Sequence, residues 1–269
     1  MTESLRKRII TAVVLAGLFL AVLLWLPRFA TVVVMTALVL AGAWEWSGFL
    51  RARRAIVRVA YATVVALLLP AAWYITATPD GRCFLLATAL VWWIVALVWI
   101  VFAPRNVAPW SAGLAGILAL VPAWIALVRL RQLVHGAQWV LFTLLLVWGA
   151  DIGAYFAGHR FGHSRLAPQV SPGKTWEGVW GGFALSAVVA LAGGAWFRLP
   201  LYSFVPLCMA AVAFSIVGDL TESLLKRFAG VKDSGTLFPG HGGVMDRIDS
   251  VTGAAPVLYF GLTLLGVVA

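Results

Sequence analysis

Long apolar runs dominate this sequence and limit what it can fold into. They cover roughly 9–26, 29–48, 57–75, 83–103, 110–129, 137–158, 177–197, 201–220 and 250–268. A helix needs about 20 apolar residues to cross the hydrocarbon core of a bilayer. The runs are continuous and do not alternate, so they indicate helices and argue against a β-barrel. We therefore expect an all-α polytopic integral membrane protein with about nine transmembrane helices.

The composition agrees with lipid as the solvent. The chain is 62% hydrophobic and 11% charged, with a net charge of +10, whereas soluble domains are about half apolar and about a quarter charged. Most bases lie between the apolar runs. The positive charge therefore favours anionic lipid and an anionic substrate, and no nucleic-acid partner is expected. Cys83 and Cys208 lack CxxC spacing, so we expect them to serve packing.

The distribution of basic residues predicts the orientation. If the N-terminus is cytoplasmic, most of the 20 lysines and arginines fall on the cytoplasmic side, as the positive-inside rule requires. The run at 9–26 follows three bases but is long and has no A-x-A cleavage site, so we interpret it as a retained first span. The bases expected outside are Arg28, Arg82, Arg129, Arg131 and Arg198.

The acidic residues divide the chain unevenly. Of ten acids, only Glu3, Glu45 and Asp80 precede residue 150. We therefore predict an N-terminal transmembrane scaffold at 1–135 and a C-terminal transmembrane catalytic region at 136–269. The catalytic region would carry cytosolic motifs at 171–178 and 219–249. Glu45 lies between Trp44 and Trp46, and we expect it at the membrane interface.

Carboxylates within or at the ends of apolar runs are the first candidate site residues. An intramembrane ionisable group costs about 2.5–3.5 kcal/mol on insertion scales and usually marks function. Asp151, Asp219 and Glu222 occupy such positions. Lys226 follows Glu222 by four residues, so an internal ion pair of Glu222 with Lys226 or Arg227 is the structural alternative. Asp219 has no close basic neighbour in sequence, which favours a functional role.

A second group of acids begins the last apolar run. Asp246 and Asp249 would share the first turn of a helix that starts near Val244. Capping of that helix is the alternative interpretation. Together with Asp219 they suit Mg²⁺, which binds few carboxylates and completes its shell with water and phosphate. We predict Asp219, Asp246 and Asp249 as ligands of Mg²⁺, with a second cation left open.

Two loops carry further candidates. The P-G-H-G-G turn at 239–243 lets backbone approach a ligand ahead of a helix N-terminus, an arrangement that binds anions. The S-P-G-K-T-W-E-G stretch at 171–178 lacks the Walker spacing and a preceding strand. Its Lys174 and Thr175 could still contact phosphate, and Glu177 could join a metal site. The alternative is a juxtamembrane loop whose single lysine reflects topology.

Residues 223–249 read S-L-L-K-R-F-A-G-V-K-D-S-G-T-L-F-P-G-H-G-G-V-M-D-R-I-D. This segment resembles the signature of the phosphatidate cytidylyltransferase (CDP-diacylglycerol synthase) family, with its S-x-x-K-R, K-D-x-G and H-G-G-x-x-D-R-x-D elements. The 171–178 stretch resembles the family's S-P-x-K-T-x-E-G motif, although Gly173 stands where many members carry lysine. The resemblance covers 151–249, and the first half matches only in apolar character and length.

The resemblance implies transfer from CTP to phosphatidic acid, giving CDP-diacylglycerol and pyrophosphate. It also implies dependence on Mg²⁺ and a site facing the cytosol in the bacterial inner membrane, among membrane lipids. The nucleophile is a phosphate oxygen that is already anionic, so no general base is required. The expected catalytic residues are Asp219, Lys226, Arg227, Lys232, Asp233, His241, Asp246 and Arg247. The expected substrate-binding residues are Asp151, Ser171, Lys174, Thr175, Glu177, Ser223, Gly242 and Gly243.

Other functions remain open at this point. An ion-coupled transporter would place acids near the midplane and show repeat symmetry, and no clear repeat is present. A cytidylyltransferase for another lipid phosphate is a nearer alternative. A CDP-alcohol phosphatidyltransferase is disfavoured because D-G-x2-A-R is absent. Small-residue faces such as those at 181–184 and 210–213 could pack helices within one chain or between two, which leaves a homodimer open.

Overall fold

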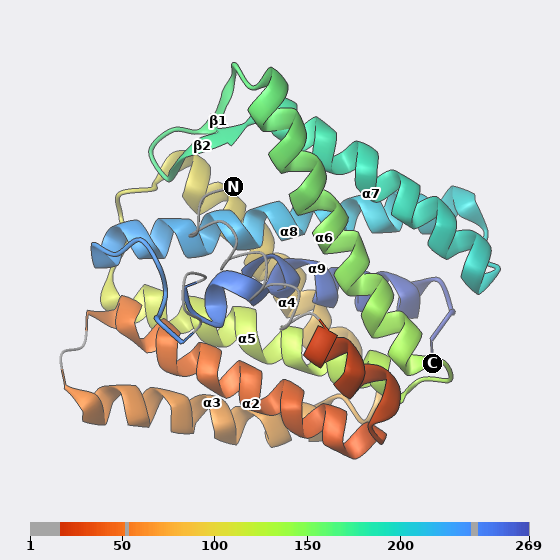
Figure 1. Ribbon diagram of the computed structural model, residues 1–269. Coiled ribbons are helices and arrows are strands. Elements are labelled where there is room, and N and C mark those ends of the chain that lie inside the picture. The colour runs from red at the N-terminus through yellow and green to blue at the C-terminus, as the bar shows by residue number, and fades with distance from the viewer. Residues whose placement is uncertain (1–16, 52–53, 238–241, 269) are drawn as a thin grey trace.

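The computed structural model describes residues 17–51, 54–237 and 242–268. Residues 17–25 are helical and precede α2, and Figure 1 shows how the elements are arranged. In chain order these elements are α2 (Arg28–Trp46), η1 (Ser47–Leu50), α3 (Ala55–Ile75), α4 (Pro79–Phe102), α5 (Pro109–Gln132), α6 (Gly136–Phe161), β1 (Arg165–Ala167), β2 (Ser171–Thr175), α7 (Trp176–Phe197), α8 (Leu201–Ala229) and α9 (Met245–Leu264).

The predicted multi-pass helical fold is confirmed. Seven helices among the described residues, α2 to α8, are long and apolar enough to cross a membrane, and each matches a predicted run. The run at 9–26 lies partly outside the described residues. The run at 250–268 falls on α9, which is not among the seven because charged residues occupy its first turns. The count of nine and the orientation of the N-terminus stay predictions.

Helix α9 lies at the centre of the bundle. It packs on α5 and α8 and is buried along most of its length, while α2 and α3 cover α5 and α7 packs on α6 (Figure 1). Close approach depends on glycine. A Cβ at Gly218 would meet the backbone carbonyl of Asp249 at 2.6 Å, and one at Gly182 would meet that of Ala150 at 2.8 Å. Small residues thus bring helices of one chain together.

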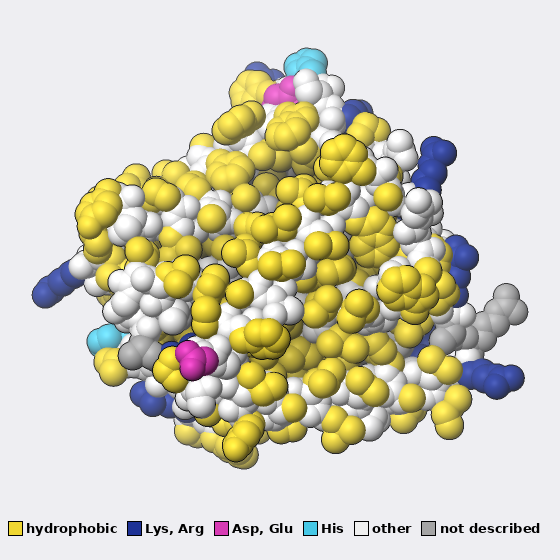
Figure 2. All heavy atoms as spheres, turned by 180° about the vertical axis from the view of Figure 1, so that it is seen from behind, with side chains coloured by type: hydrophobic (Ala, Val, Ile, Leu, Met, Phe, Trp, Pro, Cys, Tyr) yellow, Lys and Arg dark blue, Asp and Glu magenta, His cyan; other side chains and the backbone are white. Residues whose placement is uncertain are grey.

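The surface is that of a protein in lipid. Figure 2 shows hydrophobic side chains across the middle of one face, with most lysine and arginine side chains near its edges. Large apolar side chains such as Phe84, Phe102 and Trp180 are exposed, each by more than half of its area. In water such a surface would drive association, whereas in a bilayer it contacts acyl chains.

The all-α expectation holds for the bundle, with one exception outside it. Residues of the 171–178 motif form β2, which pairs antiparallel with β1, Arg165 opposite Thr175 and Ala167 opposite Ser171. Thr175 ends the hairpin and begins α7, because its Oγ1 accepts a hydrogen bond from the Gly178 N–H at 3.2 Å. This is an ordinary N-cap. The hairpin directs Lys174 toward α8.

Helix α8 is longer than its apolar run. The run ends near residue 220, but the helix continues to Ala229 and ends at Gly230, which has φ 74°. Glycine adopts this left-handed conformation without a Cβ penalty. Consequently Asp219, Glu222 and Lys226 all lie on one continuous helix.

Candidate active site

A cavity of about 690 Å³ lies where α6, the hairpin, α8 and α9 meet. Its size is typical of pockets for small ligands. Both sequence motifs and α6 contribute charged and hydroxyl side chains to its wall. They include Asp151, Lys174, Thr175, Asp219, Asp246 and Asp249. The structure therefore brings six of the predicted site residues to one cavity.

The two motifs touch through an ion pair. Lys174 of β2 binds Asp219 of α8, and both side chains are about a quarter exposed. Asp219 also accepts a hydrogen bond from the Ser223 hydroxyl at 3.4 Å. The sequence shows no basic residue close to Asp219, and it did not predict this ion pair because Lys174 belongs to a separate loop.

Lys226 joins two carboxylates in the interior. Its Nζ lies 2.6 Å from Glu222 Oε2 and 2.7 Å from Asp246 Oδ1. The Glu222 side chain is 1% exposed and that of Asp246 is 8% exposed. The structural alternative for Glu222, an ion pair with Lys226, is confirmed. Because the same lysine binds Asp246, the pair also connects α8 to α9.

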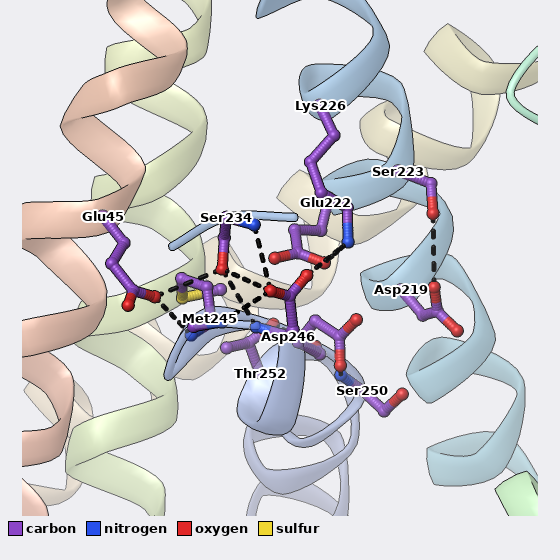
Figure 3. A network of polar contacts seen from close by, with 12 residues as sticks. Glu45, Asp219, Glu222, Ser223, Lys226, Ser234, Met245, Asp246, Ser250 and Thr252 are labelled. Carbon is purple, nitrogen blue, oxygen red and sulfur yellow. Dashed lines mark hydrogen bonds and ion pairs between the residues drawn. The ribbon is translucent and has the colours of Figure 1, made fainter. Parts of the chain in front are cut away.

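Asp246 is the most highly coordinated carboxylate at the cavity (Figure 3). Its Oδ2 accepts hydrogen bonds from the Ser234 N–H at 2.9 Å, the Ser234 hydroxyl at 2.9 Å and the Gly243 N–H at 2.8 Å. Asp246 lies outside the seven candidate spans. Burial raises the pKa of this carboxyl, but Lys226 and the two N–H groups outweigh it and hold the pKa below its usual value. The lowered pKa keeps the Asp246 carboxyl ionised, and its hydrogen bonds hold it in one position.

The predicted metal ligands share a cavity wall but do not form a ready-made cage. Asp249 accepts the Ser250 N–H at 2.7 Å and faces the same cavity as Asp219 and Asp246. Within the described ranges, no three Asp, Glu, His or Cys side chains are grouped closely enough to hold a metal ion. Mg²⁺ needs only one or two carboxylates when water and phosphate supply the rest. These carboxylates fit that mode, and Mg²⁺ stays a prediction.

The other predicted residues lie around this centre. Ser171 pairs in β2, and Glu177 accepts the Ser164 N–H at 3.1 Å on the flank of the hairpin. Gly242 has φ 76° and precedes Gly243 at the entrance to α9. His241 lies outside the described residues. The exposed residues, whose roles also stay predictions, are Arg227, Lys232, Asp233 and Arg247.

One residue of the network was missed. Glu45, near the end of α2, accepts a hydrogen bond from the Met245 N–H at 2.9 Å (Figure 3). It also lies 3.2 Å from the Ser234 hydroxyl, whose single proton it shares with Asp246. The sequence predicted only an interfacial position for it. Its sole signal was an acid inside an apolar run, which does not reveal a partner about two hundred residues away.

Comparison with known proteins agrees with the site. The cytidylyltransferase family matches residues 6–265. Phosphatidate cytidylyltransferase of Pseudomonas aeruginosa is 45% identical over 261 residues, covering 94% of this chain and 95% of that protein. The enzyme of the same name from Haemophilus influenzae is 37% identical over 278 residues, covering 94% and 96%. The similarity thus extends through the first half as well, beyond the 151–249 region. This chain belongs to the cytidylyltransferase family.

Proposed function

We propose that this protein transfers the cytidylyl group of CTP to phosphatidic acid, releasing pyrophosphate and forming CDP-diacylglycerol. The observation that carries the proposal is the Lys174–Asp219 ion pair. It joins the two signature motifs at one cavity whose wall holds both cations and carboxylates. Two relatives, 45% and 37% identical to this chain, are named for this activity. The similarity covers nearly their whole length.

The reaction requires two polyanions to meet. A phosphate oxygen of phosphatidic acid attacks the α-phosphorus of CTP, the bond from that phosphorus to the bridging oxygen breaks, and pyrophosphate leaves. The attacking oxygen is already anionic, so the protein need not remove a proton. Its task is to position the phosphates and to neutralise their charge. The cavity is suited to that task because Lys174 lines its wall, and Lys226 binds Asp246, another residue of that wall.

Both lysines are paired with carboxylates, and the exposure of each pair gives the two lysines different roles. Lys174 is bound to Asp219 in a half-buried position, so an entering phosphate would compete for it directly. Lys226 is more deeply held between Glu222 and Asp246 and would keep Asp246 in place. The exposed bases Arg227, Lys232 and Arg247 would attract CTP and the leaving pyrophosphate.

Asp219, Asp246 and Asp249 would hold Mg²⁺ together with substrate phosphate and water. When bound, the ion would supply charge neutralisation and Lewis acidity at the phosphates. Asp246 is held by Ser234, Gly243 and Lys226, so a bound ion would share this carboxylate with those donors.

The location and the direction of the site are part of the proposal. We place the protein in the bacterial inner membrane with the cavity facing the cytosol, where CTP is found. Phosphatidic acid would enter from the inner leaflet while its acyl chains remain in lipid. The positive-inside bias supports this orientation. Labelling of a single cysteine at Ser234 from the cytosolic side is expected, and labelling from the outside would contradict it.

The activity itself is tested in detergent with labelled CTP and phosphatidic acid, with and without Mg²⁺. The wild-type protein should form labelled CDP-diacylglycerol only with Mg²⁺. Asp246→Asn should lose at least about a hundredfold, because the carboxylate charge beside Lys226 is removed. Arg198→Met, at the opposite end of the bundle, serves as the control. Absence of lipid product from wild type, or full product from Asp246→Asn, would reject the proposal.

A further inference from the structure

We infer that Glu45 is a positioning residue for the active site, supplied by the N-terminal half to hold Asp246 through Ser234 and the start of α9. Of its two tests, only the kinetic measurement rests on the proposed function. The Glu45 carboxylate reaches across the bundle to two groups that flank Asp246, the Ser234 hydroxyl and the Met245 N–H. Figure 3 shows it approaching the network from the side of α2, opposite Lys226.

The position of Glu45 is unfavourable for α2 itself. It lies in the last turn of α2, where the negative end of the helix dipole repels a carboxylate. It also lies within an apolar run, where a charge is costly. Neither the stability of α2 nor its insertion explains an acid here. The compensating interactions are those with the 234–245 segment.

The contact to Met245 caps a second helix. Met245 is the first residue of α9, and Val244 at the N-cap provides no side-chain hydrogen bond. The first N–H groups of a helix have no partner inside it. Glu45 accepts one of them at 2.9 Å, so a carboxylate from α2 does what a local cap usually does. The start of α9 is thereby fixed relative to α2, and Asp246 is the next residue.

The contact to Ser234 reaches Asp246 from the other side. The Ser234 hydroxyl lies 3.2 Å from Glu45 Oε2 and 2.9 Å from Asp246 Oδ2. The Ser234 N–H also binds Asp246 Oδ2. Glu45, Ser234 and Asp246 therefore form a chain of contacts. Loss of Glu45 would therefore remove one contact from the serine and one from the first turn of α9 together.

Two glycines of the signature make room for this carboxylate. A Cβ on Gly235 or on Gly243 would collide with the Glu45 side chain. Because Gly243 also donates its N–H to Asp246, the same short segment contacts both acids. The Glu45 side chain, from the other half of the chain, thus explains why glycine stands at these positions of the K-D-x-G and H-G-G elements.

The first experiment measures the backbone without any substrate. Hydrogen–deuterium exchange is compared between the wild-type protein, Glu45→Ala and Asp80→Ala. The Asp80 variant is the control, because Asp80 is another acid of the first half and lies in the first turn of α4. Glu45→Ala should accelerate exchange in peptides containing Ser234 and Met245 and leave peptides of α3 unchanged. Asp80→Ala should leave all of these unchanged. Equal protection in Glu45→Ala and wild type would overturn the inference.

The second experiment measures kinetics. Glu45→Ala should lower kcat by about tenfold or more, because small misplacements of a reacting group have effects of this order. KM for phosphatidic acid should change by less than about twofold. Glu45→Gln keeps an oxygen acceptor for the Met245 N–H and should recover part of the loss. A drop in kcat without faster exchange at Ser234 and Met245 would contradict positioning and indicate direct contact with substrate.

Two further variants keep the test decisive if Glu45→Ala does not fold. Ser234→Ala breaks the chain of contacts in the middle. Because Glu45 and Ser234 act on the same carboxylate, Ser234→Ala combined with Glu45→Gln should lose much less than the product of the two single effects. Fully multiplicative effects would overturn the inference. If wild type forms no CDP-diacylglycerol, the proposed function fails, while the exchange result still decides the role of Glu45.

Discussion

The cations of the two halves bind different partners. In the first half, Arg51, Arg129 and Arg131 donate to backbone carbonyls, among them those of Phe228, Trp73 and Leu26. In the second half, Lys174 and Lys226 bind carboxylates. A carbonyl at a helix end is a permanent acceptor, and a cation there stabilises the helix. A carboxylate can be exchanged for a phosphate. The named cations of the first half therefore stabilise the structure, whereas Lys174 in the second half is paired with a carboxylate that a phosphate would replace under the proposed function.

Glu45 is the exception that connects the two halves. Among the described acids of the first half, Glu45 is the one that enters the network around Asp246. Arg51 makes a similar connection, since it donates to the Phe228 carbonyl and lies over the Phe228 ring at the end of α8. Because of such contacts, residues 136–269 do not pack independently of the first half. The boundary at 135 remains an interpretation of composition.

The largest effect on stability is expected at Lys226. Lys226→Met leaves Glu222 and Asp246 buried without a cation and should cost about 3–5 kcal/mol in the free energy of unfolding. Lys232→Met, at an exposed lysine of the same half, should cost less than about 0.5 kcal/mol. The free energies of unfolding of the two variants are measured in the same detergent and compared. Equal stability of the two variants would show that the internal ion pair does not support the fold.

Lys174 should separate stability from catalysis. Its ion pair with Asp219 is half-buried, so Lys174→Met should change the free energy of unfolding by no more than about 1 kcal/mol. Because a charged hydrogen bond to phosphate would be lost, kcat/KM for CTP should fall roughly ten- to a hundredfold. The matched control is Arg198→Met. Unchanged kcat/KM would remove Lys174 from the chemistry and weaken the contrast between the halves.

A scaffold position in the first half should behave in the opposite way. The Tyr61 hydroxyl donates to the Gly113 carbonyl at 2.9 Å in the interface of α3 and α5. Tyr61→Phe should therefore destabilise by about 1 kcal/mol and leave kcat of the folded protein unchanged. Tyr74→Phe, at an exposed tyrosine, should change neither quantity. A reduced kcat in Tyr61→Phe at full folding would extend the chemistry into the first half.

The smallest effect is expected at Gly173. This glycine lines the cavity, and an added Cβ would have no neighbour within 4 Å. Gly173→Lys introduces a cation at the cavity wall. It should lower KM for CTP by roughly two- to fivefold, the range of an exposed charge pair. Gly173→Gln controls for size. An increase in KM with lysine alone would show that the cavity already has sufficient positive charge.

Much of the fold was predictable because its causes are local. Seven apolar runs became helices α2 to α8, and the start of α9 beside Val244 was expected. The pair Glu222–Lys226 follows from the helical repeat alone. The β1–β2 hairpin was missed since its strands have only three and five residues. Such short strands carry no clear alternation of apolar and polar residues.

The sequence by itself determined the class of fold, the candidate residues of both motifs and the local Glu222–Lys226 pair. Hydropathy and helical spacing act between near neighbours, so they are readable in a single chain. Only the tertiary structure decided that Lys174 binds Asp219, that Lys226 also binds Asp246, and that Glu45 reaches the start of α9. These contacts join separate helices and loops. They depend on how the bundle packs, which no local pattern specifies.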